Sequence, residues 1–261
     1  MHTQTLDVIP LWCFLPLIFG VCLMSLEGGF RLGRWRHSLA AEEKEAPVAA
    51  MVAAVLGLLA FMLAFTFSLA ASRFDARRQA VLEEANAIGT TYLRSRLLPE
   101  PEGSEIARLL SRYTELRTQK MTTENIGDLL AESDKLHGQM WSRAIAAAEK
   151  DSGSIMTGLF LESLNESIDL HSKRVFVGLY SRVPIAIWLM LLGLVVLGMV
   201  SLGYQAGLVA TLRSLEMLIF ALAFTCVLYL ILDLDRAHEG FLQISQKAMV
   251  DLHNSMQARQ P

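Results

Sequence analysis

Four long stretches without a charged residue constrain the fold of this chain more than any other feature of its sequence. They cover residues 8–26, 46–72, 183–212 and 217–232. Crossing the hydrocarbon core of a bilayer takes about 20 predominantly apolar residues in a helix. The sequence therefore predicts an integral membrane protein, and membrane lipid is the first partner that we expect.

The overall composition agrees with this interpretation and excludes several classes of protein. Of the 261 residues, 53% are apolar and 19% are charged, whereas about 25% of a soluble domain is charged. The formal net charge of −3 offers no basic surface for nucleic acid. Three cysteines lie inside the apolar stretches without a CxxC motif, which indicates small apolar residues rather than a redox pair.

We predict four transmembrane helices. The stretch 183–212 is too long for one helix, and the glycines at 203–207 are expected to break it. Residues 27–29, Glu-Gly-Gly, are expected to end the first helix. The predicted transmembrane helices cover about 8–26, 47–72, 184–203 and 210–232.

Residues 73–182 are polar, with nearly balanced charge and helical periodicity throughout. The second transmembrane helix should continue without a break to Leu98, and Ser104 and Thr123 are plausible N-caps of the next two helices. A fourth polar helix should run towards Pro184. The predicted fold is all-α and polytopic, divided into 1–72 (two transmembrane helices), 73–182 (helical polar domain), 183–232 (two transmembrane helices) and 233–261 (polar tail).

The distribution of Lys and Arg predicts the orientation in the membrane. Five basic residues flank the transmembrane helices on one side and eight on the other. Because the more basic side faces the cytoplasm, both termini and residues 73–182 are expected to be cytoplasmic.

No motif for catalysis or for a cofactor is present, so we expect neither an enzyme nor a bound cofactor. Six histidines are scattered without an i,i+4 pair, which is typical of ordinary surface or core residues. Three acidic residues after the fourth transmembrane helix are weak candidates for binding a hard cation. Their spacing does not match an EF-hand, and a solvated helix end is the favoured interpretation for Asp233, Asp235 and Glu239.

The second transmembrane helix carries the most informative pattern. Phe61, Phe65 and Leu69 recur every four residues, and around a symmetry axis they would stack into apolar rings that gate by dewetting. Lipid contact or helix packing explains the same spacing. A neighbouring stripe of small residues would let another helix approach closely. The stripe comprises Ala53, Gly57, Ala60, Ala64, Ser68 and Ala71.

Basic residues follow this helix directly. Arg73, Arg77 and Arg78 would concentrate anions at a pore mouth. A cluster that fixes the cytoplasmic side of the helix explains them equally well.

The run from residue 63 to 78, LAFTFSLAASRFDARR, resembles the second transmembrane helix of bestrophins, with a shift of about one residue between Arg73 and Arg77. The segments EEANAIGTTYLRSRLLP (83–99) and DLDRAHEGFLQISQ (233–246) resemble more closely the bacterial bestrophin-like membrane family of unassigned function. The resemblance covers most of the chain.

Bestrophins are pentameric anion channels with both termini and the large domain in the cytoplasm. The resemblance therefore implies a homo-oligomer in the bacterial inner membrane that conducts small anions such as chloride. It also implies that Phe61, Phe65 and Leu69 form the neck of the pore. The alternative is a membrane-anchored helical scaffold without transport activity, in which residues 73–182 recognise a partner.

Overall fold

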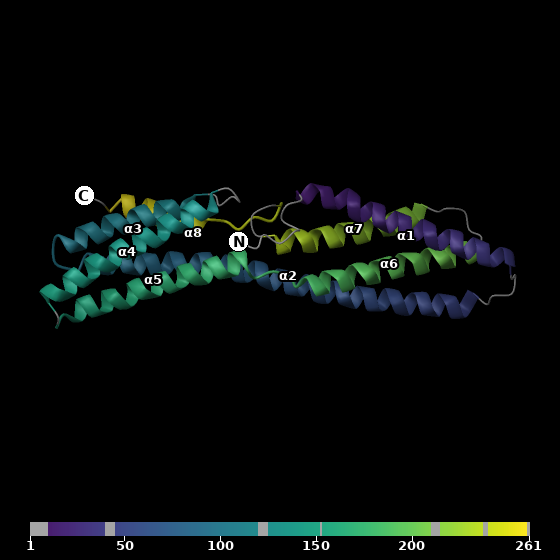
Figure 1. Cartoon of the computed structure of the whole chain (residues 1–261), viewed down its shortest axis with the longest axis horizontal. Helices are drawn as coiled ribbons and strands as arrows, with labels where there is room; N and C mark the ends of the chain where they lie inside the picture. Colours follow the sequence, from purple (N-terminus) through teal and green to yellow (C-terminus); the bar gives the residue numbers. More distant parts are fainter. Residues whose placement is uncertain are drawn as a thin grey trace. The chain divides into compact units, whose positions relative to one another are not determined.

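The computed structural model describes residues 10–39, 45–119, 125–151, 153–209, 215–236 and 240–259. These residues form eight α-helices and no strand (Figure 1). The chain divides into two compact units, and α2 (Glu45–Ser95) contributes to both. The first unit comprises residues 1–73 and 182–242, and the second comprises 74–181 and 243–261.

The first unit contains the helices that are long and apolar enough to cross a membrane. They are α1 (Leu11–Leu39), the first part of α2, α6 (Ile185–Leu208) and α7 (Leu215–Asp235). α1 packs against both α6 and α7. The four predicted apolar stretches thus correspond to four helices, although several ends differ from the predicted ones.

Glycines join α1 to α6 instead of ending either helix. Gly29 and Gly33 of α1 face Gly203 and Gly207 of α6, and a Cβ at any of these positions would overlap the backbone of the opposite helix. The prediction that residues 27–29 end the first helix is therefore wrong, as is the predicted break at 203–207. Residues 29–33 and 203–207 are each a Gly-x-x-x-Gly motif, whose small residues let two membrane helices approach closely.

α2 is a single helix of 51 residues, which confirms the predicted continuation beyond the apolar segment to within one turn.

The predicted start of the next helix, with Ser104 as its N-cap, is wrong. α3 (Glu102–Thr118) begins two residues before Ser104, and the Ser104 hydroxyl donates to the carbonyl of Pro101 from inside the first turn. Thr123, the other predicted N-cap, lies outside the described residues. So do Lys44 and Arg213, two of the five basic residues counted on the less basic side of the membrane.

The second unit is a helical bundle around an apolar core. The end of α2 packs there with α3, α4 (Ile126–Lys150), α5 (Ile155–Leu179) and α8 (Lys247–Gln257). Apolar residues at helical spacing supply this core, in agreement with the helical periodicity predicted for residues 73–182. Its buried members include Ile88, Tyr92, Ile106, Leu110, Tyr113, Leu136, Met140, Phe160 and Leu164.

The connection between α5 and α6 and the structure of the C-terminal tail differ from the sequence-based expectation. α5 ends at Leu179 and α6 begins at Ile185, so the last polar helix does not continue into the third apolar one. The predicted polar tail contains α8, which packs on α3 and buries Met249 and Met256 in the core of the second unit. α8 is therefore part of the polar bundle.

Candidate functional site

The apolar half of α2 has one face packed inside the first unit and another that the described residues of this unit leave uncovered. Leu59 and Leu63 are buried, and Leu59 approaches Gly198 of α6. Phe61 and Phe65 are 67% and 53% exposed, whereas Leu69 is half-buried. The structure thus leaves the two predicted neck phenylalanines accessible on the isolated chain.

The small-residue stripe of α2 lies on this uncovered side. Five of its members are exposed and Ala71 is half-buried, so the stripe is not the surface that packs inside the chain. The packing residues are instead Val52, Leu59, Leu63, Thr66 and Ala70. A role of the stripe in helix packing therefore stays a prediction, and it applies only to a contact with another chain. The exposed members are Ala53, Gly57, Ala60, Ala64 and Ser68.

The three predicted pore-mouth cations have different surroundings. Arg73 donates to the backbone carbonyl of Arg182 within the first unit. Arg77 is only 3% exposed, whereas Arg78 is exposed. Arg78 is consequently the member of the three that presents its charge most openly to solvent.

Asp233 and Asp235, which follow the fourth apolar stretch, are buried, so their interpretation as part of a solvated helix end is wrong. The Asp233 carboxylate accepts from the backbone N–H groups of Phe241 and Leu242, at 2.9 and 3.0 Å. Asp235 accepts from the backbone N–H of Val183 at 2.8 Å. Both carboxylates therefore organise the backbone around them, and Glu239, the third candidate ligand, lies outside the described residues.

A buried ionic cluster, which the sequence analysis did not predict, lies inside the second unit. Glu84 of α2 is 0% exposed and binds two buried guanidinium groups. Its Oε1 lies 3.1 Å from Nε of Arg117, and its Oε2 accepts from Arg174. Arg174 also donates to Gln246, just before α8, at 2.7 Å. The cluster therefore ties α2, α3, α5 and the C-terminal segment together.

Tyr113 extends this cluster towards two histidines. Its hydroxyl donates to Glu84 Oε1 at 2.7 Å and lies 2.9 Å from Nδ1 of His171. Burial, together with the adjacent Glu84 carboxylate, raises the pKa of Tyr113 well above its usual range, so the phenol keeps its proton. The His137 ring lies 4.9 Å from that of His171, centroid to centroid, and burial lowers its pKa to about 4.

Sequence reasoning placed these histidines among ordinary surface or core residues. Both are buried, as a core interpretation allows, but their proximity was missed because they lie 34 positions apart on different helices. The only local signal was the i,i+3 spacing of Asp134 and His137, which places both on one face of α4.

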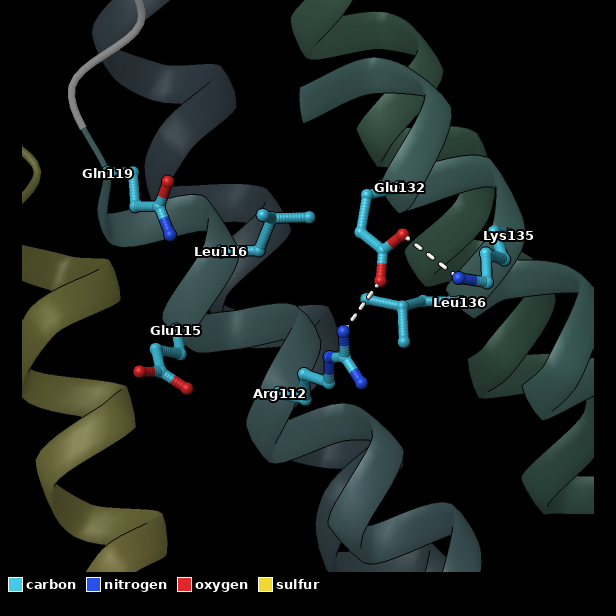
Figure 2. Close-up of a pocket in the computed structure, with 7 residues that line it drawn as sticks. All are labelled: Arg112, Glu115, Leu116, Gln119, Glu132, Lys135 and Leu136. Carbon is cyan, nitrogen blue, oxygen red and sulfur yellow. Dashed lines mark hydrogen bonds and ion pairs between the residues drawn. The ribbon is translucent and has the colours of Figure 1, made fainter. Parts of the chain in front are cut away.

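A surface hollow of about 310 Å³ between α3 and α4 is a weaker candidate for a functional site than the buried cluster. Figure 2 shows that three of its four charged side chains bind one another: Glu132 accepts from Arg112 at 2.8 Å and from Lys135 at 3.3 Å. Glu132 therefore engages both cations of the hollow.

The helices and their apolar faces define an integral membrane protein. The sequence matches the model of the Bestrophin-like domain over residues 19–249, and the chain belongs to this family. No curated protein matches it.

The same fold occurs in solved structures. A bacterial bestrophin homolog from Klebsiella pneumoniae, solved by Zn-SAD phasing, has a TM-score of 0.66 at 19% identity, over 95% of this chain and 98% of that one. A membrane protein with a single substitution has a TM-score of 0.67 at 18% identity, over 95% and 97% of the two chains. At such identities the likeness describes the fold alone.

Proposed function

We propose that this protein assembles from five copies around a pore that α2 lines and that conducts small anions such as chloride. The observation that carries the proposal is the uncovered face of α2, where Phe61 and Phe65 lie exposed beside the small-residue stripe. Membership in the Bestrophin-like family supports the same conclusion.

Small residues on an uncovered membrane helix favour contact with another helix. Lipid chains pack against side chains of any size, whereas Gly, Ala and Ser allow two helix backbones to approach closely. The stripe therefore supports a contact between neighbouring copies. In that arrangement Phe61, Phe65 and Leu69 of successive copies form rings around the axis, and such an apolar constriction gates by dewetting.

The exposed Arg78 follows the proposed neck and raises the local concentration of anions. In this proposal the polar bundle and both termini lie in the cytoplasm and the apolar helices lie in the bacterial inner membrane. The greater number of basic residues on that side of the predicted transmembrane helices supports this orientation.

Chloride efflux from proteoliposomes tests the proposal. Wild-type protein is compared with the double variant Phe61→Ala/Phe65→Ala, and with Leu189→Ala/Met190→Ala as a control. Leu189 and Met190 of α6 are each 66% exposed, so the control removes similarly accessible side chains from another helix. We expect wild-type efflux above that of protein-free liposomes, a changed rate in the α2 variant and an unchanged rate in the control.

Efflux that the α2 variant does not change would remove Phe61 and Phe65 from the neck. No efflux from folded, inserted wild-type protein would contradict the channel itself. That result would favour a membrane-anchored scaffold whose polar bundle binds a partner.

A further inference from the structure

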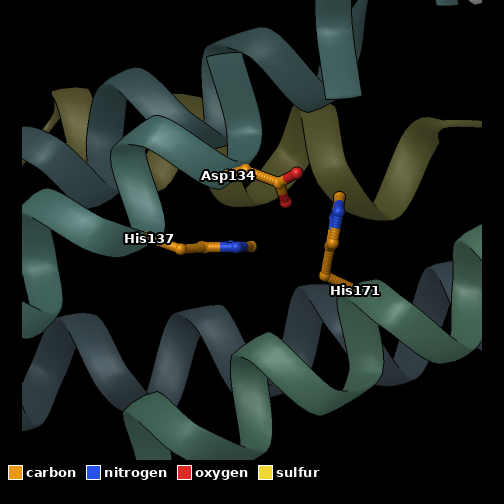
Figure 3. A group of neighbouring side chains, drawn as sticks. All are labelled: Asp134, His137 and His171. Atoms are coloured by element: carbon orange, nitrogen blue, oxygen red, sulfur yellow. The ribbon is translucent and has the colours of Figure 1, made fainter. Parts of the chain in front are cut away.

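Asp134, His137 and His171 gather their ligand atoms in one small region of the second unit. One ligand atom from each lies within 4.8 Å of the others. Asp134 and His137 come from α4 and His171 from α5, and Figure 3 shows the carboxylate and both rings turned towards one another. Asp134 is exposed, so solvent reaches the cluster from this residue.

His137 carries an unused ligand atom. Its side chain is only 7% exposed, and its Nε2 is buried without a hydrogen-bond partner. Buried polar atoms in proteins are nearly always paired, and an exception calls for an explanation such as an absent ion. This nitrogen is an observation independent of the clustering.

Tyr113 fixes which ring nitrogen carries the proton when the His171 imidazole is neutral. Tyr113 has one hydroxyl proton, which it donates to Glu84 at 2.7 Å. The 2.9 Å contact between Tyr113 and Nδ1 of His171 is then a bond that the imidazole donates. With its proton on Nδ1, His171 keeps a lone pair on Nε2. Histidines that bind metals typically donate their second nitrogen to such a partner.

We propose that Asp134, His137 and His171 bind a divalent first-row transition metal of the Zn²⁺ type, with water as the fourth ligand. Two imidazole nitrogens and one carboxylate suit this class of ion, whereas Ca²⁺ and Mg²⁺ prefer sites built from oxygen. Zinc–ligand bonds of about 2.0–2.2 Å require the three groups to move slightly closer together. Rotation of the exposed Asp134 side chain supplies part of this movement.

The neighbouring charges set the expected strength of binding. Glu84 cancels one of the two positive charges of Arg117 and Arg174, so one net positive charge remains near the site. The Asp134 carboxylate opposes this charge. We therefore expect weaker binding than at a closed zinc site with four protein ligands, and a bound ion that braces α4 against α5.

Zinc titration of the full-length protein, stripped of metal and purified in detergent, tests the site. Calorimetry should show one equivalent per chain, and Co²⁺ should give the visible absorption of a tetrahedral complex. Asp134→Asn and His137→Gln each remove a direct ligand, so each should weaken binding at least as much as the roughly 10- to 100-fold loss that is typical for a residue that only orients a ligand. Asp128→Asn, which changes an exposed aspartate on the same helix, is the matched control and should bind as wild type does.

Tyr113→Phe examines the positioning of His171 separately. It should weaken zinc binding roughly tenfold, since it removes the acceptor at 2.9 Å and leaves Nδ1 only the more distant Glu84 Oε1 at 3.5 Å. Because Asp134 is exposed, its variant should fold even where a core variant does not. Absence of saturable zinc binding to wild-type protein, or binding that survives both Asp134→Asn and His137→Gln, would overturn the proposal.

Discussion

Gly33 of α1 and Gly207 of α6 lie backbone against backbone. A Cβ added to Gly33 would stand 3.1 Å from Cα of Gly207 and would overlap the carbonyl oxygen of Tyr204. One turn away, Gly29 and Gly203 make equally close approaches to the opposite helix. Together these glycines allow a contact between α1 and α6 that any side chain would force apart.

Alanine at Gly33 or Gly207 should therefore destabilise the first unit. Overpacking a close contact costs about 1–3 kcal/mol, and here the obstacle is rigid backbone rather than a flexible side chain. The measurement is the thermal unfolding midpoint of the full-length protein in detergent. Gly20→Ala on α1 and Gly193→Ala on α6 are the matched controls, because a Cβ at either position meets nothing within 4 Å. Equal midpoints for all four variants would contradict the close packing.

Glu84→Gln should be strongly destabilising. It removes the negative charge that pairs with both Arg117 and Arg174, and breaking a buried ion pair typically costs 3–5 kcal/mol. The neighbouring Glu83→Gln is the control: its partner Lys173 is about half-exposed, and such surface pairs contribute about 0–1 kcal/mol. Denaturant unfolding of both variants checks this difference, and similar losses would contradict the structural role of Glu84.

Enlarging the stripe on α2 should disrupt assembly without unfolding the chain. Ala60→Leu/Ala64→Leu adds bulk at exposed positions where the proposed neighbouring copy packs. We expect a smaller assembly by light scattering after size-exclusion chromatography, with little change in the unfolding midpoint. Ala223→Leu on the exposed side of α7 is the control. An unchanged mass for the double variant would place the contact between copies elsewhere.

The sequence was sufficient to predict the helices because their apolar residues repeat with a period that burial requires. The buried positions Ile88, Tyr92, Leu110 and Phe160 illustrate this agreement. The sequence was insufficient at Gly29 and Gly203, because a glycine can either end a helix or allow two helices to pack closely. A glycine that no other helix contacts tends to end its helix. A glycine against which another helix packs stays within its helix and allows the two backbones to approach closely. Only the partner helix distinguishes these cases.

The ionic cluster and the histidine pair were beyond sequence reasoning for a related reason. Glu84 and Arg174 lie 90 positions apart, and each resembles an ordinary charged residue of a polar helix. Tertiary packing brings them together and excludes water from them. The same limit applies to Asp233. Its partners are the backbone N–H groups of Phe241 and Leu242, which only the folded chain brings to the carboxylate.

The most direct test of the central claim is a block of chloride efflux at a single introduced cysteine. Cys13, Cys22 and Cys226 are first replaced, and cysteine is then placed at Phe65 or, as the control, at Leu189. If α2 lines the pore, a negatively charged thiol reagent should reduce efflux through the Phe65→Cys protein and leave the Leu189→Cys protein unaffected. Complete labelling of Phe65→Cys without any change in efflux would contradict the account.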